Sequence, residues 1–592
     1  MLTRQSLSLR SLVFVRRFLR NDLLVLAAVA VVIGGVAGCG AIALREAIVL
    51  TQYLFYGDGS ERLLSLAIYL PWWHVLLAPA AGGLLVGLFL QYVMPGQRPR
   101  SVADVVAASA VQGSHIPLRV GIAAAIVNAF SIGVGASVGR EGPAVHLGAA
   151  LASKVGHLLH FSRRLARTTL ACGAAAAVAA SFNAPIAGAL FAHEVIVGHY
   201  ALSAFAPVVI ASVTGTVVSR IYFGDFPAFI LPPYEMGSFW EFPAFALLGV
   251  VAGLVAIVFM RSIIFVCDTV EATKTPLWLR PAVAGLAVGA MALMFPHVLG
   301  VGYQATDAAL HGRYDLLLLV GLAVAKVAAT AISLGSGFGG GVFSPSLFIG
   351  AMVGGAFGVV ATALNPELSS GHNAYALIGM GAVAGAVLGA PISTTLIIFE
   401  MTADYTLTIA LMLSVVLASV IVQQVQGRSF FLWQLERRGL NLGGGRDAGL
   451  LEAIRVGAVM RNDCAIVPID LSLQGVRLKL QGTRYGELFV VDGDGRLYGT
   501  VTLADLSDAA FDHSYDDMVN AADLARRRPP VLHADDGLDK ALALMESLGE
   551  EHVAVVAANS TMKMIGCLHE HDVMMAYNRA LARLRREERS GI

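Results

Sequence analysis

The chain has 592 residues, of which 56% are hydrophobic and only 14% are charged. Soluble domains carry charge on about 25% of their residues, so this composition excludes a soluble enzyme. The formal net charge is zero, and no part of the chain has the strongly basic character that nucleic-acid binding requires.

The charges are concentrated towards the C-terminal end. Residues 441–592 carry 40 of the 82 charged side chains, which leaves residues 1–440 overwhelmingly apolar. The chain is therefore predicted to contain a large membrane domain followed by a water-soluble one.

An arginine-rich segment, residues 1–22, precedes the first long apolar run at 23–44. This run is too long for the core of a signal peptide and has no clear cleavage site, so it predicts a retained span. Positive charge favours the cytoplasmic side of a membrane. We therefore expect a multi-pass protein of the cytoplasmic (inner) membrane, with its N-terminus and its C-terminal domain in the cytoplasm.

Eleven further apolar segments lie between residues 74 and 425. Some are shorter than the ~20 residues that a perpendicular helical span requires, and many contain Gly or Pro. Interrupted helices are tolerated at membrane depth only where the backbone is buried in protein or lines a cavity. This pattern is typical of a transport protein.

Three glycine-containing segments, at 113–117, 139–143 and 340–345, each precede an apolar helical run. Each can place a helix N-terminus inside the protein, where unpaired N–H groups and the helix dipole form an anion site. Glu141 lies in the second segment. Ionised, it would occupy that site, and protonated it would leave, which predicts a gate controlled by pH. The alternative is a local ion pair with Arg140.

The membrane domain contains an internal repeat. Residues 143–149 (Pro-Ala-Val-His-Leu-Gly-Ala) have a counterpart at 345–351 (Pro-Ser-Leu-Phe-Ile-Gly-Ala), and further pairs recur at offsets of about 202 to 206 residues. Such a repeat predicts a substrate site at the interface between the copies. The spacing alone leaves parallel and inverted copies open. The further pairs are Gly173 with Gly379, Ala184-Pro185-Ile186 with Ala390-Pro391-Ile392, and Glu194 with Glu400.

The C-terminal part begins with a glycine-rich linker at 441–455. Two similar units follow, at 456–515 and, with the C-terminal tail, at 516–592. Short β-like runs alternate in them with helical runs, which predicts a tandem α/β module. Each unit contains the pattern Gly-x-hydrophobic-x-x-x-Asp, from Gly499 to Asp505 and from Gly566 to Asp572.

The cysteines give no sign of a metal or disulfide framework. All five lie far apart and form no C-x-x-C pattern, so we expect small buried hydrophobic side chains. His193, Glu194 and His199 lack the H-E-x-x-H spacing that places two histidines on one helix face. No metal site is predicted. No G-x-x-x-x-G-K-[ST] motif occurs, so a P-loop pump has no support.

Together, the three glycine segments resemble the signature motifs of the CLC family of chloride channels and chloride/proton antiporters: G-S-G-I-P, G-R/K-E-G-P and G-x-F-x-P. They occur in order, with Asn183-Ala184-Pro185 and Phe399-Glu400-Met401-Thr402, and the resemblance covers residues 30 to 440. It implies that residues 23–440 form an all-α polytopic membrane domain of tilted, broken helices in two inverted repeats. It also implies a homodimer with one anion pathway per subunit.

The resemblance also assigns roles to individual residues. The Ser114 hydroxyl and the backbone N–H groups of Val342 and Phe343 would bind the central chloride. Glu141 would be the gating glutamate. An outer anion site would lie near the backbone of Arg140, Glu141 and Gly142.

Three positions depart from the family pattern. His115, beside the anion-binding serine, is either a bystander or a charge that tunes anion entry. Val195 aligns with the glutamate that transfers protons in the antiporters, and valine cannot carry a proton. Phe431 replaces a tyrosine that binds the central anion, so a hydrogen bond worth about 1 kcal/mol is lost. The loss at Phe431 implies a looser inner gate or a weaker central site, and the valine at 195 favours passive conduction.

The C-terminal module resembles paired CBS domains. Thr502 and Asp505 match the ribose-binding pattern in the first unit, whereas the second keeps Asp572 but has His569 where Ser or Thr is usual. The resemblance implies either one adenine-nucleotide site or a ligand-free module that dimerises and couples to the gate. No other cofactor is expected.

The sequence as a whole predicts a passive chloride channel, gated by protonation of Glu141 and modulated by the CBS pair. Its ligands would be chloride, other small anions and protons. The first alternative is a chloride/proton antiporter that moves protons through water or through Glu194. A nucleotide-sensing receptor is disfavoured, because a membrane anchor requires neither repeats nor an intramembrane glutamate.

Overall fold

The chain divides into two compact units, Met1–Leu440 and Asn441–Ile592. The N-terminal arginines, the glycines of the linker and His199 lie outside the residues that can be described. The computed structural model describes residues 22–59, 63–110, 113–161, 163–198, 202–225, 238–402, 405–438, 440, 451, 454–483, 486–502, 504–506, 516, 518–527, 529–548, 551–557 and 561–589.

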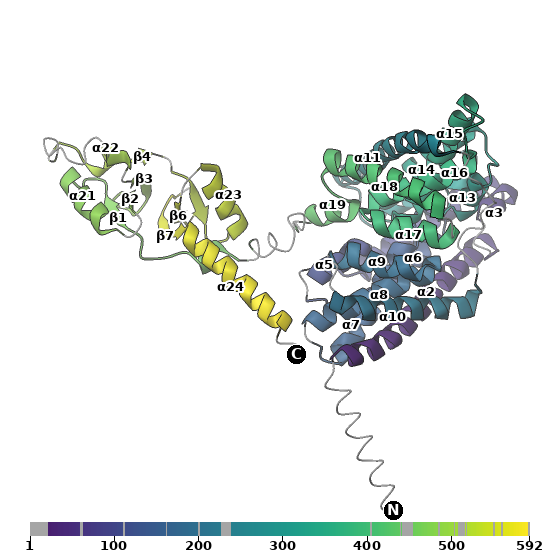
Figure 1. Cartoon of the computed structure of the whole chain (residues 1–592), viewed down its shortest axis with the longest axis horizontal. Helices are drawn as coiled ribbons and strands as arrows, with labels where there is room; N and C mark the ends of the chain where they lie inside the picture. Colours follow the sequence, from purple (N-terminus) through teal and green to yellow (C-terminus); the bar gives the residue numbers. More distant parts are fainter. Residues whose placement is uncertain are drawn as a thin grey trace, which may run out of the picture. The chain divides into compact units, whose positions relative to one another are not determined.

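The first unit is built from helices (Figure 1). Its described residues include 8 helices that are long and apolar enough to cross a membrane. The first of them, α2, has 35 residues. At 1.5 Å per residue α2 is about 52 Å long, well beyond the roughly 30 Å hydrocarbon core, so it is long enough to cross the membrane even when tilted. The predicted polytopic fold of long and interrupted helices is confirmed.

The helices form two sets of eight that follow one another in a similar order of lengths, beginning with helices of 35 and 31 residues. The first set is α2 (Asp22–Tyr56), α4 (Trp72–Tyr92), α5 (Val102–Ala110), α6 (Leu118–Gly133), α7 (Glu141–Leu158), α8 (Arg163–Phe182), α9 (Pro185–Phe191) and α10 (Leu202–Phe223). The second set is α11 (Phe242–Ala272), α12 (Arg280–Met294), α13 (Tyr303–Leu310), α14 (Leu316–Gly335), α15 (Phe343–Leu364), α16 (His372–Leu388), α17 (Pro391–Thr402) and α18 (Tyr405–Gln426). Helices outside the two sets are α3 (Leu63–Tyr69) and α19 (Phe430–Glu436).

The two sets exchange equivalent contacts. The carboxylate of Glu194, just after α9, accepts hydrogen bonds from the N–H groups of Ile392 and Ser393 at the start of α17, at 3.1 and 2.8 Å. Glu400, in α17, accepts hydrogen bonds from the corresponding N–H groups at the start of α9, at 2.9 and 2.8 Å. Reciprocal contacts of this kind are produced by a twofold relation. The two repeats are therefore related by an approximate twofold axis.

Glycine is required where neighbouring helices of each repeat touch. A Cβ on Gly148 would lie 2.5 Å from the carbonyl oxygen of Gly173, where α7 packs on α8. A Cβ on Gly350 would lie 2.3 Å from the carbonyl oxygen of Gly379, where α15 packs on α16. Only a residue without a Cβ permits this approach. This is the physical reason why the repeat keeps these glycines.

Gly350→Ala is expected to lower the free energy of unfolding by about 1–3 kcal/mol, because the added methyl group must push α15 away from α16. The matched control is Gly35→Ala in α2, where a Cβ meets nothing within 4 Å. We expect the midpoint of thermal unfolding in detergent, followed by tryptophan fluorescence, to fall for Gly350→Ala alone. Equal midpoints for both variants would contradict the packing argument.

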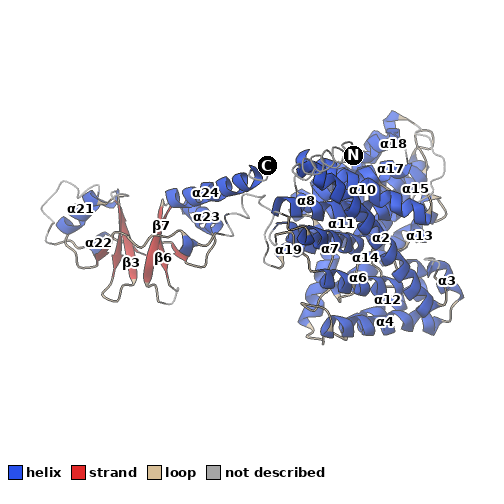
Figure 2. Ribbon diagram, turned by 90° about the horizontal axis from the view of Figure 1, so that it is seen from below, coloured by secondary structure: helices blue, strands red, loops and turns tan. Residues whose placement is uncertain are grey.

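The second unit contains two copies of one α/β motif, drawn as the red strands and flanking helices of Figure 2. In each copy the first strand pairs in parallel with the second, and the second pairs antiparallel with the third. The antiparallel register shifts at equivalent points, after Val490 and after Val555. The predicted tandem module is confirmed. The first copy contains β1 (Ile466–Pro468), α21 (Leu473–Gly482), β2 (Glu487–Val491), β3 (Leu497–Thr502), α22 (Ala521–Leu524) and β4 (Arg526–Arg527), and the second contains β5 (Val531–His533), α23 (Leu538–Leu548), β6 (His552–Val556), β7 (Met564–His569) and α24 (Glu570–Arg589).

The expectation that every cysteine is a small buried residue is wrong. Cys464 and Cys567 form a disulfide across 103 positions of sequence, and Cys39 is exposed, whereas Cys172 is buried as expected. The disulfide forms because the backbone of Arg461, shortly before β1, exchanges two hydrogen bonds with Cys567 of β7. Sequence spacing gives no signal of a contact between two domains.

Candidate functional site

Two helix N-termini meet at the interface between the repeats. Gly139 and Gly341 exchange backbone hydrogen bonds of 2.7 and 2.8 Å. Two residues further on, α7 begins at Glu141 and α15 begins at Phe343. The first N–H groups of a helix have no partner within it and lie at the positive end of its dipole. Two electropositive ends therefore face the same small space, which suits an anion.

Glycines allow the chain to close around this space. A Cβ on Gly142 would lie 2.5 Å from Ser101 Oγ. A Cβ on Gly139 would lie 2.9 Å from Glu141 Oε2 and 3.0 Å from the backbone nitrogen of Ser344. Any larger residue at either position would displace the groups that form the site.

Glu141, the predicted gate, is 1% exposed and lies where the helices meet. Its Oε1 accepts hydrogen bonds from the hydroxyls of Tyr303, which begins α13, and of Ser344, in the first turn of α15, the latter at 2.5 Å. Its Oε2 is buried and has no hydrogen-bond partner among the described residues. The guanidinium of Arg140 lies over the Tyr303 ring, 4.8 Å from its centroid. A carboxylate of the first repeat is thus held by two hydroxyls of the second.

Ser114 does not lie near the Glu141 carboxylate. The Ser114 carbonyl accepts a hydrogen bond of 3.1 Å from Ser153 Oγ. Ser153 lies twelve residues beyond Glu141 on α7, which is about 18 Å along the helix. The Gly-Ser-His-Ile-Pro segment therefore precedes α6 at a distance from Glu141, and the hydroxyl predicted for the central anion is elsewhere.

Ser101, which precedes α5, lies where Ser114 was expected. Its hydroxyl is next to Gly142, as the 2.5 Å distance above establishes. Its N–H donates to Asp104 Oδ2 at 3.1 Å, as in a capping box. The sequence signal for this helix start is the pattern Ser-x-x-Asp before an apolar run. It was not used, because the segment at 113–117 matched the family motif.

Val342 and Phe343 are buried at the N-terminus of α15, as predicted. The Phe343 ring packs against Phe182 and Phe191, with centroids 4.8 and 6.2 Å away. These aromatic contacts pack the first turn of α15 against α8 and α9.

The three departures from the family pattern lie in different surroundings. His115 is exposed, and its ring lies 5.4 Å from that of His157, near the end of α7, so it is as remote from Glu141 as Ser114 is. Val195 is half-buried in a short π-helical segment, Ala192–Val197. Phe431 is buried in the first turn of α19, which packs against α5.

Helix α19 also connects to α5 through charge. Arg438, just after α19, lies 3.2 Å from the carboxylate of Asp104, which also binds Arg98 and Arg100 at 2.6 and 2.9 Å. Asp104 is 8% exposed. The segment that leads to the C-terminal unit is therefore joined to the helix that carries Ser101.

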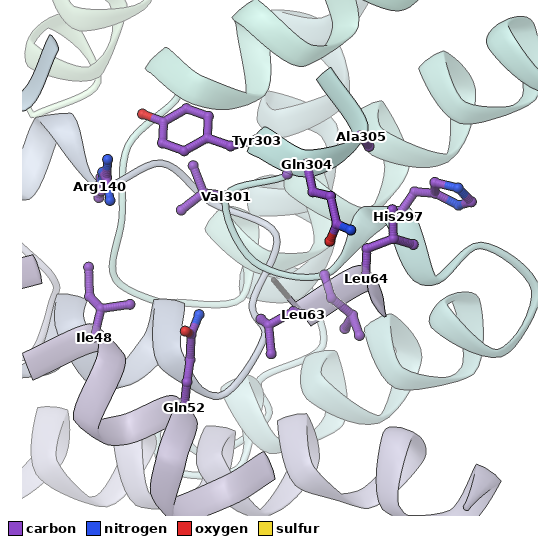
Figure 3. Close-up of a pocket in the computed structure, with 12 residues that line it drawn as sticks. Ile48, Gln52, Leu63, Leu64, Arg140, His297, Val301, Tyr303, Gln304 and Ala305 are labelled. Carbon is purple, nitrogen blue, oxygen red and sulfur yellow. The ribbon is translucent and has the colours of Figure 1, made fainter. Parts of the chain in front are cut away.

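A cavity of about 30 Å³ lies beside Arg140 and Tyr303 (Figure 3). Gln52, Gln304 and His297 complete its polar lining. The volume is large enough to hold water. Water bound there would lie beside Arg140 and Tyr303, the latter a hydrogen-bond partner of Glu141.

Within the C-terminal unit, the two aspartates predicted to bind a nucleotide, Asp505 and Asp572, have different hydrogen-bond partners. Asp505 Oδ2 accepts hydrogen bonds from the backbone N–H and hydroxyl of Thr502, at 2.8 and 2.7 Å. Both oxygens of Asp572 are bound by Arg461, at 2.6 and 2.7 Å. These hydrogen bonds lower the pKa of Asp572. Asp505 Oδ2 also lies 3.3 Å from Arg526 Nε, so an arginine of the chain contacts the carboxylate at both positions, through one oxygen of Asp505 and both oxygens of Asp572.

Tyr303 and Ser344 were not predicted from the sequence. Ser344 occupies the variable position of the G-x-F-x-P motif, so the motif gave it no role. Tyr303 lies 162 residues from Glu141 in sequence and is joined to it only by the fold. The one local signal is Gly300-Val-Gly302 before a short helix, which indicates a tight turn.

Comparison with known proteins gives a consistent result. The family model described as Voltage gated chloride channel matches residues 82–423, and the CBS domain model matches residues 456–512 and 521–579. A chloride channel protein described as ClcB-like, from Ralstonia nicotianae, is 35% identical over 68% of this chain and 96% of its own length. The voltage-gated ClC-type chloride channel ClcB of Escherichia coli O157:H7 is 32% identical over 68% and 97%.

Two solved structures share the fold. A slow cyanobacterial Cl-/H+ antiporter superposes with a TM-score of 0.62 at 23% identity, over 70% of this chain and 97% of the other. A eukaryotic CLC transporter superposes with a TM-score of 0.61 at 20% identity, over 93% and 98%.

Proposed function

The chain belongs to the voltage-gated chloride channel (CLC) family and carries out CLC-type chloride transport, and from this premise we propose that it conducts chloride passively through a pathway that Glu141 gates. The observation that carries the proposal is the position of the Glu141 carboxylate between the N-termini of α7 and α15. An anion and an ionised carboxylate compete for that electropositive space, and a protonated carboxyl group does not.

The ligands of the permeant anion follow from the same geometry. We propose the backbone N–H groups of Val342 and Phe343, with the Ser101 hydroxyl in the role that the motif had assigned to Ser114. The outer position near Arg140, Glu141 and Gly142 is the one that the carboxylate itself fills.

The surroundings of Val195 and Glu194 support passive conduction over proton exchange. Valine offers no proton-carrying group at the position of the antiporter glutamate. Glu194 is occupied as a helix cap, because the N–H of Ser393 and its hydroxyl donate to the same oxygen at 2.8 and 2.5 Å. To pass protons, Glu194 would have to give up the contacts that hold the two repeats together.

Chloride/proton exchange is the second candidate, and one measurement separates the two. In proteoliposomes with an imposed chloride gradient, we expect chloride efflux without a coupled change of external pH, with or without a proton ionophore. If the imposed chloride gradient drives protons against their own gradient in proteoliposomes that contain the native protein, the protein is an antiporter. In that case Glu194→Gln, compared with Glu367→Gln on the surface, tests the proposed internal route.

Placement and regulation complete the proposal. The basic N-terminal flank supports an inner-membrane protein with both its N-terminus and its CBS pair in the cytoplasm. We propose a homodimer, as the CLC resemblance implies. The CBS pair would act on the pathway through Arg438 and Asp104, with an adenine nucleotide at Thr502 and Asp505 as its ligand.

A further inference from the structure

The Glu141 carboxylate has two hydroxyl partners, Tyr303 and Ser344, to which the family's motifs assign no role. Tyr303 and Ser344 both donate to Oε1, and the two hydroxyl oxygens lie 3.4 Å from each other. Both donors belong to the second repeat, whereas Glu141 belongs to the first. The contact therefore fixes the side chain across the interface between the repeats.

The local backbone places both donors for this contact. Gly302 has a φ of +90°, which is the left-handed region that favours glycine, and it turns the chain so that α13 starts at Tyr303. Ser344 is the second residue of α15, so its hydroxyl projects from the same helix end that attracts the carboxylate. The Arg140 guanidinium lies on the Tyr303 ring and limits the movement of that ring.

We propose that Tyr303 and Ser344 form a latch that holds ionised Glu141 in the closed position and thereby sets the pH at which the pathway opens. Hydroxyl donors stabilise a carboxylate more than a protonated carboxyl group, because hydrogen bonds to a charged acceptor are roughly twice as strong. A proton from the aqueous solution therefore competes with the latch. When the proton is bound, the carboxyl group leaves the two hydroxyls and the anion takes the vacated space.

Other charged and titratable groups face this site from the packed elements and remain unchanged in the variants below. Arg140 contacts the Tyr303 ring. The Lys326 side chain of α14 packs against the turn at Gly302, where a Cβ would lie 3.3 Å from its Nζ. Lys326 donates to the carbonyl oxygens of Val298 and Gly300, at 3.1 and 2.9 Å. On the α5 side, the charged and titratable groups are Asp104, His146, Arg98, Arg100 and Arg438, and His297 lines the cavity beside Arg140 and Tyr303.

The latch rests on the proposed gating by Glu141, and its test separates the two ideas. Chloride flux from proteoliposomes is measured as a function of pH for the native protein, Tyr303→Phe, Ser344→Ala and Glu141→Gln. Loss of either hydroxyl makes protonation easier, so the pH of half-maximal flux is expected to rise by about one unit. Adding either latch variant to Glu141→Gln is expected to leave the flux independent of pH.

The matched controls are Ser346→Ala and Tyr314→Phe. The Ser346 hydroxyl donates to the Val342 carbonyl of its own helix, and the Tyr314 ring packs against His297. We expect native pH profiles for both. The latch would be overturned if Ser344→Ala elutes as the native oligomer and if both Ser344→Ala and Tyr303→Phe keep the native pH of half-maximal flux.

A failure of the gating proposal would give a different result. The native protein would then show chloride flux without pH dependence, or Glu141→Gln would keep the native profile. If Tyr303→Phe does not assemble, the result for Ser344→Ala is sufficient by itself. This substitution removes only a hydroxyl group and preserves α15.

Discussion

Glu141→Gln is expected to remove the pH dependence of chloride flux and to hold the pathway open at neutral pH. The amide keeps the size of the carboxyl group and its capacity to accept from Tyr303 and Ser344, but it lacks the negative charge. Flux of the native protein should rise as pH falls, because protonation removes the charge that competes with chloride at the N-termini of α7 and α15. The variant has no such charge at any pH.

The measurement is initial chloride efflux from proteoliposomes between about pH 3.5 and pH 8, a range that spans the ordinary titration of a glutamate, whose pKa is about 4.3. A single titrating group changes its ionised-to-protonated ratio about tenfold per pH unit, so native flux should change by at least that factor across the range. The chloride flux of Glu141→Gln should vary by less than about twofold over the same pH range, because the variant has no titrating group at this position. Glu367→Gln, an exposed glutamate between α15 and α16, serves as the control and should keep the native profile. A Glu141→Gln protein as pH-sensitive as the native one would remove Glu141 from the gate.

The architecture was predictable because it depends on local chemistry. Gly and Pro before an apolar run indicate a helix start, and at 139–143 and 340–345 the structure has helix starts that meet. The repeated glycines at 173 and 379 are kept because both contact a backbone carbonyl region of a neighbouring helix. Equal intervals in the two copies place Glu194 and Glu400 at equivalent positions, and the structure adds that each one caps a helix of the other repeat.

The parts of the site that the sequence missed depend on contacts between distant segments. The Tyr303 hydroxyl reaches Glu141 only because α13 of the second repeat lies beside α7 of the first. The disulfide of Cys464 and Cys567 requires the two CBS domains to be in contact. No periodicity or spacing encodes either distance.

The error at Ser114 has a different cause. The local pattern Gly-Ser-x-Ile-Pro matched a family motif, but a match of five residues does not determine which helix end lies near Glu141. The chain between Ser114 and Glu141 contains α6 and the turn that follows it, whereas the hydroxyl beside Gly142 comes from Ser101, one helix earlier. Position in the fold therefore takes precedence over the local match.

This difference leads to the second large expected effect, a loss of chloride affinity in Ser101→Ala and not in Ser114→Ala. A hydrogen bond to a charged ligand contributes about 1.5–3 kcal/mol, so chloride binding should weaken at least tenfold when the Ser101 hydroxyl is removed. Ser114→Ala should keep the native affinity, because the contacts at that position are made by its backbone.

Isothermal titration of the detergent-solubilised protein with chloride measures both affinities. Removing a helix cap also costs about 1 kcal/mol of stability, so Ser101→Thr is included as the variant that keeps a hydroxyl and the cap. Recovery of affinity in Ser101→Thr assigns the effect to the hydroxyl and not to the start of α5. The opposite pattern, with Ser114→Ala weakened and Ser101→Ala unchanged, would return the anion to the Gly-Ser-His-Ile-Pro segment. The central site would then lie about 18 Å along α7 from Glu141, too far for that glutamate to compete with it.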